Sequence, residues 1–194
     1  MGFGHLRVIN DDRVEPTRGF GTHPHKNMEI ISYVVSGELS HKDTIGTGSI
    51  IRPGEVQLMS AGQGIAHSEF NPSETDPVSF LQIWILPSES GGEPGYQQHD
   101  FGDTQGLTLV VSPDGSSDSL TIKQDMSLYR LLLSEGEAVN HGVQRARAWV
   151  QVIRGPLEVN GVVLQPGDGL AVQDLAELNF HAQGEVEALV FDLL

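Results

Sequence analysis

The chain is 194 residues long, enough for one large domain or two small ones with a buried core. Its 26 acidic residues outnumber its 11 basic residues and give a formal net charge of −15, which repels the phosphate backbone and argues against direct binding to DNA or RNA. Because the chain has no cysteine, disulfides and thiolate ligands are excluded, and any metal site must use nitrogen and oxygen ligands.

The sequence shows no apolar segment typical of export or membrane insertion. The opening stretch MGFGHLRVINDDRVEP carries charges where a signal peptide needs an apolar core. The longest apolar run, FLQIWILP, is far too short to cross a bilayer. We therefore expect a soluble, cytoplasmic protein that does not contact a membrane.

Short apolar runs recur along the whole chain and are separated by turns rich in glycine and proline. This spacing, with 23 glycines and 10 prolines, is typical of an all-β sandwich or barrel with few or no helices. In chain order, strands are expected at residues 6–9, 28–37, 48–54, 55–62, 79–87, 107–113, 119–125, 128–136, 148–155, 156–161, 170–174 and 187–194.

Glycine and polar residues interrupt the strand pattern at residues 88–106, where we expect a domain boundary. Two segments recur across this boundary: residues 33–40 resemble 151–158, and residues 52–59 resemble 165–172. Such internal similarity indicates two copies of one structural unit. The sequence therefore predicts an N-terminal domain at residues 1–100 and a C-terminal domain of the same design at residues 101–194.

Histidines and a carboxylate recur at a spacing of two residues in two short motifs. His23 and His25 lie in GTHPHKNME, and His67 and Glu69 lie in GQGIAHSE. Side chains two residues apart on a β-strand point to the same face, so two such strands can direct four ligands at one point. Three imidazoles and a carboxylate suit a mononuclear transition metal that keeps positions open for substrate. The alternative is surface or core histidines satisfied by hydrogen bonds.

The second copy of the repeat lacks this ligand set. When Pro53 is aligned with Pro166, Phe180 and Ala182 fall at the positions of His67 and Glu69. His141 remains at the position of His23 when the matching glycines are superposed. His181 also remains, but it is one residue out of phase, so we expect it on the opposite face of its strand. Because two histidines without a carboxylate rarely hold a metal, we expect no metal in the C-terminal domain.

The framework around both motifs, G-x-H-x-H-x3-E-x7-G and P-G-x12-H-x-E, resembles the two cupin motifs. The segments GFGTHPHKNMEIISYVVSGELSHKD, MSAGQGIAHSEFNPS and LQIWILP resemble the pirin family, in particular its bacterial members similar to quercetin 2,3-dioxygenase. The resemblance runs over most of the chain and implies a bicupin of two jelly-roll (double-stranded β-helix) barrels. Pirins usually carry a few tens of residues before the segment matching MGFGHLRVIND, and these are absent from this sequence.

The resemblance implies that the N-terminal barrel binds one divalent transition metal through His23, His25, His67 and Glu69. Fe(II) is the expected ion, with Zn, Mn, Ni, Co or Cu as alternatives. Ordinary cupins take their carboxylate from the first motif, which is Glu29 in this chain. Its odd number predicts the same strand face as His23 and His25, so parity leaves Glu29 open as a rival. Pirins instead use the carboxylate after the last histidine, which favours Glu69.

The resemblance also implies an activity, the cleavage of a flavonol such as quercetin by dioxygen. In that reaction Glu69 takes the proton of the 3-hydroxyl group, and ring cleavage releases carbon monoxide and a depside. The small aromatic substrate and dioxygen are then the partners, with no nucleic acid. Two other functions remain open: a metal- or redox-responsive regulator that acts through a protein partner, and a cupin that binds a small ligand without oxygenase activity.

Four further side chains are candidates for the walls of a substrate pocket. Phe20 and Met28 flank the first motif, and Met59 precedes the second, although core packing is the more common role for such apolar residues. His41 follows a glycine turn, where we expect either a pocket mouth or a surface loop.

Overall fold

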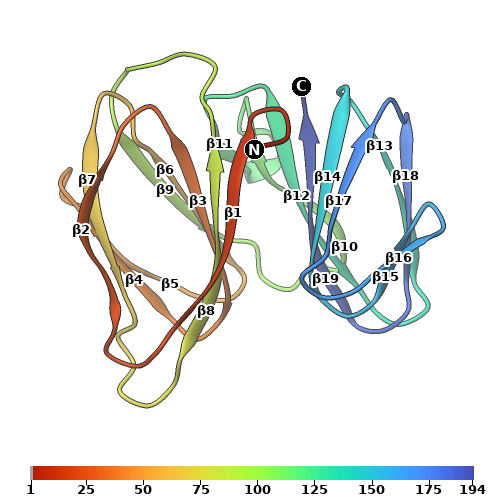
Figure 1. The fold of residues 1–194 in the computed structure, drawn as a ribbon, viewed down its shortest axis with the longest axis horizontal. Coiled ribbons are helices and arrows are strands. Elements are labelled where there is room, and N and C mark those ends of the chain that lie inside the picture. Colours follow the sequence, from red (N-terminus) through yellow and green to blue (C-terminus); the bar gives the residue numbers. More distant parts are fainter. Residues whose placement is uncertain (1) are drawn as a thin grey trace. The chain divides into compact units, whose positions relative to one another are not determined.

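The protein is described by a computed structural model in which residues 2–194 are placed. Antiparallel strands dominate it, and the only helical element among these residues is a short 3-10 turn, η1 (Ser116–Asp118). The chain divides into two compact units (Figure 1). The N-terminal unit runs to Gly102 and includes Ile122–Gln124, and the C-terminal unit comprises Asp103–Thr121 and Asp125–Leu194.

The N-terminal unit consists of two antiparallel sheets. The larger sheet has the order β1 (Leu6–Val14), β8 (Val78–Ile85), β3 (Glu29–Ser36), β6 (Glu55–Ser60), β9 (Gly95–Asp100). The smaller has the order β2 (Gly19–His25), β7 (Ile65–Phe70), β4 (Leu39–Asp43), β5 (Gly48–Ile51). Central strand β3 is buried over most of its length, as its run of apolar and β-branched residues predicts.

The core of the N-terminal unit lies between its two sheets, in separate apolar clusters. One cluster joins residues of both sheets: Val14, Val34, Leu39, Ile51, Val78 and Phe80. The other contains Ile30, Met59, Ala61 and Ile65, with Met28 and Trp84 packed against it. On β3, Ile30 belongs to the second cluster and Val34 to the first. Buried Ser32 lies between them on the same strand face, so a polar layer separates the two clusters.

The C-terminal unit repeats this plan. Its larger sheet has the order β11 (Leu120–Thr121), β10 (Gly106–Ser112), β12 (Met126–Leu133), β19 (Val186–Leu193), β14 (Arg147–Arg154), β17 (Gly169–Gln173). Its smaller sheet has the order β13 (Ala138–Gly142), β18 (Glu177–Ala182), β15 (Leu157–Val159), β16 (Val162–Leu164). One continuous apolar cluster, which includes Leu131, Val150 and Phe180, fills the space between the sheets.

The all-β class is therefore confirmed, while several strands lie outside the expected runs. β9 lies inside residues 88–106, the stretch in which the sequence predicts a boundary, and it pairs with β6. β4 and β13 are too short and polar to stand out as apolar runs, and β1 is longer than expected. Within residues 2–194 the structure contains no helix long and apolar enough to cross a membrane.

Candidate metal centre

Two paired strands, β2 and β7, bring the first and second histidine motifs together. His23 lies directly opposite His67 in the antiparallel register, and His25 lies opposite Ile65. An irregularity between Phe20 and His23 adds one residue to β2 relative to β7, as in a β-bulge. The sequence was compatible with pairing of the two motif strands, and the structure shows that they pair, with the two motifs side by side.

The rings of His23, His25 and His67 converge in the N-terminal unit. Their centroids are 4.8 Å apart for His23 and His25, 4.5 Å for His23 and His67, and 4.9 Å for His25 and His67. One ligating nitrogen from each ring lies within 4.8 Å of the other two. Three nitrogens at this separation can share one cation of ordinary coordination distance.

The environment keeps His25 and His67 neutral, as metal ligation requires. Burial, followed by charge repulsion from His23 and His25, lowers the pKa of His67 to about 3. Burial and repulsion from His23 also lower the pKa of His25. A neutral imidazole offers one nitrogen lone pair, so these two rings are suitable donors near pH 7.

The nitrogens that face the site lack protein partners. Nε2 of His25 and Nε2 of His67 are buried and accept or donate no hydrogen bond among the described residues. His23 Nδ1 donates to the carbonyl oxygen of Gly21 at 2.8 Å, which leaves its Nε2 with the lone pair. Since unpaired buried nitrogens are unfavourable, their convergence fits a bound cation.

Glu69 lies on β7 two residues after His67, and both residues are 1% exposed. Gln82 Nε2 donates to Glu69 Oε2 at 2.6 Å, and the Ser32 hydroxyl donates to Oε1 at 3.3 Å. Burial raises the pKa of Glu69, and these two hydrogen bonds oppose that shift. His67, Glu69 and His41 form a second group with ligating atoms within 4.8 Å, so His67 belongs to both groups.

A tryptophan fixes the side chain that holds Glu69. Trp84 Nε1 donates to Gln82 Oε1 at 3.2 Å, so the Gln82 amide must present its NH2 group to Glu69. The Trp84 and His25 rings also pack in a T-shaped arrangement, with ring centroids 5.2 Å apart. Trp84 therefore contacts both the imidazole side and the carboxylate side of the site, a role that its sequence context did not indicate.

Glu29 does not share a strand with His23 and His25, so the parity argument for it was wrong. The chain turns at Asn27, which has a positive φ of 54°, and Glu29 begins β3 in the other sheet. There its carboxylate accepts hydrogen bonds from the Ser60 hydroxyl at 2.7 Å and from the backbone N–H of Lys123 at 3.3 Å. Glu29 belongs to neither of the two groups that could hold a metal ion.

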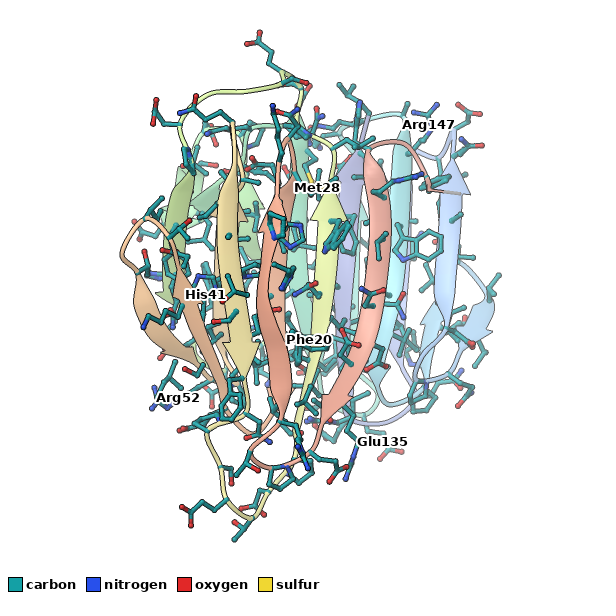
Figure 2. All side chains as sticks on the ribbon, turned by 60° about the vertical axis from the view of Figure 1, so that its left-hand side comes forward. Phe20, Met28, His41, Arg52, Glu135 and Arg147 are labelled. Atoms are coloured by element: carbon teal, nitrogen blue, oxygen red, sulfur yellow. The ribbon has the colours of Figure 1, made fainter. Side chains whose placement is uncertain are left out.

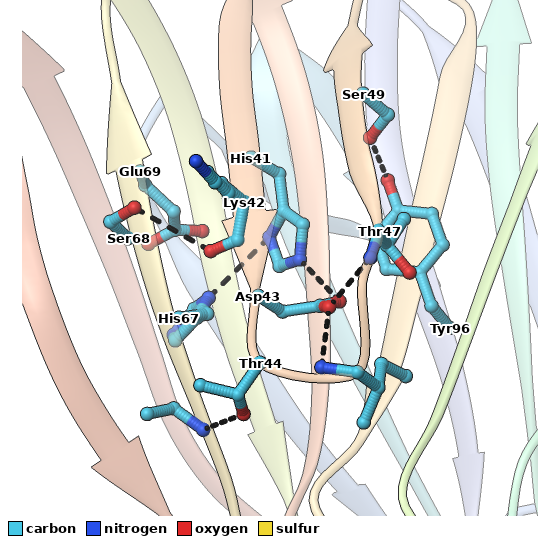
Figure 3. A network of polar contacts seen from close by, with 12 residues as sticks. His41, Lys42, Asp43, Thr44, Thr47, Ser49, His67, Ser68, Glu69 and Tyr96 are labelled. Carbon is cyan, nitrogen blue, oxygen red and sulfur yellow. Dashed lines mark hydrogen bonds and ion pairs between the residues drawn. The ribbon is translucent and has the colours of Figure 1, made fainter.

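His41 was expected in a loop at a pocket mouth or on the surface, and both expectations were wrong. It lies on β4 and is 1% exposed (Figure 3). Its Nε2 contacts Asp43 Oδ2 at 3.1 Å, and its Nδ1 lies 3.5 Å from His67 Nδ1. Burial lowers the pKa of His41 more strongly than the Asp43 carboxylate raises it. Its H-x-D spacing on one strand face was the signal available in the sequence.

The apolar candidates for pocket walls have separate positions. Phe20 on β2 is 42% exposed, whereas Met59 is buried in an apolar cluster with Met28 packed against it. Phe20 and Met28 lie at different heights of the molecule in Figure 2. A shallow pocket of about 430 Å³ lies beside His25, and none of these three residues lines it. Its lining is Pro24, His25, Lys26, Thr44, Gly64, Ile65 and Ala66. Pro24 and Ala66 alternate with the histidines, so the pocket lies largely on the opposite sheet face.

The C-terminal unit has one inward-facing histidine at the matching strand pair, because His181 on β18 is exposed. His141 on β13 is paired with Leu178 on β18, and its Nε2 lies 3.5 Å from Asp192 Oδ2. Its ring packs against Tyr129 with centroids 4.6 Å apart. His141 belongs to neither of the metal-compatible groups found among residues 2–194.

Two units of paired antiparallel sheets in one chain define a bicupin, and the histidine and glutamate groups of its first unit are compatible with one divalent metal ion. A family model described as Pirin matches residues 1–85, and one described as Quercetinase C-terminal cupin domain matches residues 109–193. The chain is 48% identical over 194 residues to an Escherichia coli K12 protein named quercetin 2,3-dioxygenase, covering 100% of this chain and 84% of that protein. The chain belongs to the pirin family.

Solved structures agree with this assignment. The crystal structure of the bacterial pirin YhhW from Escherichia coli in complex with nickel(II) superposes with a TM-score of 0.95 at 48% identity, covering 100% of this chain and 84% of that chain. A Caulobacter vibrioides protein named pirin-like protein is 38% identical over 197 residues, covering 99% of this chain and 84% of its own length. The pirin family expected from the sequence motifs is thus confirmed.

Proposed function

We propose that this protein is a metal-dependent dioxygenase that cleaves flavonols such as quercetin with dioxygen. The observation that carries the proposal is the convergence of three imidazoles, two of them neutral with buried, unpartnered Nε2 atoms, next to a buried carboxylate. The names of several curated relatives, quercetin 2,3-dioxygenase among them, support the substrate class.

In this proposal His23, His25, His67 and Glu69 hold the metal in the N-terminal unit, and the C-terminal unit holds none. Fe(II) remains our expectation for the ion in the cell, while the nickel(II) complex of a relative supports a site for a divalent ion. When bound, such an ion supplies Lewis acidity that lowers the pKa of a substrate hydroxyl group, and it leaves coordination positions open.

Glu69 acts as the general base for the flavonol 3-hydroxyl group. Its burial excludes water and raises its pKa, which makes its carboxylate a stronger proton acceptor than an exposed one. Gln82 and Ser32 donate to its two oxygens and hold the carboxylate in place. Each oxygen keeps a further lone pair, so proton transfer does not require these bonds to break. Ring cleavage then converts the flavonol and dioxygen to a depside and carbon monoxide.

The test is an aerobic assay with quercetin. Metal-free protein is reconstituted separately with Fe(II), Mn(II), Co(II), Ni(II), Cu(II) and Zn(II), and loss of the near-ultraviolet band of quercetin is followed together with carbon monoxide release. We expect turnover with at least one ion and none in metal-free protein. No carbon monoxide with any of the six ions would remove the dioxygenase proposal and favour a regulatory or ligand-binding pirin.

A further inference from the structure

Three buried side chains form a line that ends at His67 (Figure 3). The Asp43 and His41 side chains are both 0% exposed, and Asp43 Oδ2 lies 3.1 Å from His41 Nε2. His41 Nδ1 in turn lies 3.5 Å from His67 Nδ1, a long hydrogen bond. The Tyr96 ring packs against His41 with centroids 4.9 Å apart, so His41 is held from the side as well as at both nitrogens.

The two oxygens of Asp43 have different partners. Oδ1 accepts hydrogen bonds from the backbone N–H groups of Ile45 at 3.0 Å and Thr47 at 2.9 Å. These bonds close the turn after β4 and fix the orientation of the carboxylate, so Oδ2 faces His41 alone. An ionised carboxylate can only accept hydrogen bonds, and His41 Nε2 must therefore carry a proton.

The proton on His41 Nε2 determines the state of the next ring. A neutral imidazole has one N–H group, so His41 Nδ1 is left as an acceptor. The facing His67 Nδ1 must then be the donor, which leaves the lone pair of His67 on Nε2. That atom is the buried nitrogen without a protein partner, and it faces the other histidines of the site.

We infer that Asp43 and His41 are positioning residues that fix the tautomer of His67, so that His67 presents an unprotonated Nε2 for metal ligation. The inference rests on the proposed function only in taking His67 as a ligand, and it holds whatever the substrate is. Partners of this kind set ring orientation and tautomer at metal sites, and their loss typically lowers metal affinity about 10- to 100-fold.

Asp43→Asn is the sharpest variant for the test. The amide oxygen of asparagine is expected to stay with the N–H groups of Ile45 and Thr47, which keeps the turn intact. The NH2 group then faces His41 Nε2 and donates to it, so His41 must carry its proton on Nδ1. His67 Nδ1 becomes the acceptor, and its Nε2 is protonated and unable to ligate. An isosteric change in a residue outside the proposed ligand set thus reverses both tautomers.

Two measurements on the full chain detect the change of tautomer. Long-range proton–nitrogen NMR of the metal-free protein assigns which nitrogen of each imidazole carries hydrogen, and His67 is expected to be protonated at Nδ1 in the wild type and at Nε2 in Asp43→Asn. Competition with a chelator gives the affinity for nickel(II), which is expected to fall about 10- to 100-fold. Neither measurement depends on quercetin turnover.

Asp100→Asn is the matched control. Asp100 also closes a turn in the N-terminal unit, by accepting from the Gly102 backbone N–H at 2.8 Å, and the change removes the same charge away from the site histidines. It is expected to retain the wild-type tautomer and nickel affinity. His41→Phe is a second variant that leaves the turn intact, and it is expected to give mixed His67 tautomers and a smaller loss of affinity than Asp43→Asn.

The outcomes separate this inference from the proposed function. Nickel binding with the expected tautomers but no quercetin cleavage would remove the dioxygenase and leave the positioning role standing. An unchanged His67 tautomer in Asp43→Asn, with nickel affinity within about twofold of the wild type, would overturn the positioning role. Wild-type protein that binds no nickel would also overturn it.

Discussion

The strand pair β2–β7 in the N-terminal unit and the pair β13–β18 in the C-terminal unit occupy the same places in their sheets, yet they face different cores. Each is the first pair in a smaller sheet of four strands. β7 directs His67 and Glu69 inward, whereas β18 directs Leu178, Phe180 and Ala182 inward. The shared architecture does not require a polar interior, so the polar groups of the first unit are there for another reason.

The polar residues of the N-terminal unit form one layer between two apolar ones. On β3 the inward sequence is Ile30, Ser32, Val34, and the paired residues on β8 are Trp84, Gln82 and Phe80. Ser32 and Gln82 are therefore neighbours in the middle, where both donate to Glu69. Burying these groups is unfavourable unless they are satisfied, and the hydrogen bonds to Glu69 satisfy them. The comparison shows that the N-terminal unit has polar side chains in place of apolar packing at this level, and that they support the Glu69 carboxylate.

His67→Leu makes the N-terminal unit resemble the C-terminal unit and should have the largest effect. Leucine removes the residue shared by both metal-compatible groups, so metal binding should be abolished. The change removes the unpartnered Nε2 but also the hydrogen-bond partner of buried His41 Nδ1, so these contributions oppose each other and the free energy of unfolding of the metal-free protein should change by less than about 1 kcal/mol. Metal analysis and urea unfolding measure the two effects. Stoichiometric metal in the purified variant would contradict the assignment of His67.

Glu69→Gln tests which part of the polar layer serves chemistry. The amide keeps the shape of the side chain but cannot take a proton, so turnover of quercetin should fall about 10²- to 10⁴-fold. Three imidazoles remain, and metal occupancy should fall much less than turnover. Single-turnover assays at matched metal content separate the two effects, with Glu74→Gln, an exposed change, as the control. Full turnover at full occupancy would exclude Glu69 as the base.

Leu178→His tests the comparison from the other side. It places a second imidazole opposite His141, in the arrangement that His23 and His67 have in the N-terminal unit. With only two imidazoles, and with the Asp192 carboxylate already accepting from the backbone N–H groups of Gln144 and Arg145, we expect no second metal ion. The buried polar group should lower the free energy of unfolding by about 1–3 kcal/mol. Metal stoichiometry and chemical unfolding are the readouts, and Leu178→Met is the matched apolar control. A second equivalent of tightly bound metal would show that two imidazoles suffice there.

The last expected effect is on the pH dependence of stability without metal. The pKa of His67 is about 3 in the folded protein and near 6.5 when unfolded, so the unfolded chain binds more protons between these values. The free energy of unfolding should therefore rise with pH across this window, and the slope should be shallower in His67→Leu. Glu69 acts in the opposite sense, since burial raises its pKa. Urea unfolding in EDTA at a series of pH values measures the difference, and parallel curves would contradict it.

The proposed ligands could be predicted from the sequence because side chains alternate between the two faces of a strand with a fixed period of two. The spacing of His23 and His25, and of His67 and Glu69, predicts a common face without knowledge of the fold. The same reasoning gave a wrong strand face for Glu29, because the chain turns at Asn27 and Glu29 belongs to a strand of the other sheet. The turn depends on the backbone angles at Asn27, which cannot be inferred from residue spacing alone.

The supporting side chains were harder to predict for a different reason. His41 is distant in sequence from His67, Gln82 from Glu69, and Trp84 from His25, and only the pairing of strands brings them close. β9 was missed because its residues, GYQQHD, alternate weakly and follow a stretch rich in glycine. Predicting it would have required knowing that the edge of β6 was available for pairing.

The place of β2 in its sheet bears on how fast a metal ion can exchange. β2 pairs with β7 alone, whereas β7 is paired on both sides, with β2 and β4. Edge strands open locally at a lower free energy than strands in the middle of a sheet. Fraying of β2 would carry His23 and His25 away while His67 and Glu69 stay in place. Exchange would then follow a local opening of one strand and would be far more frequent than global unfolding.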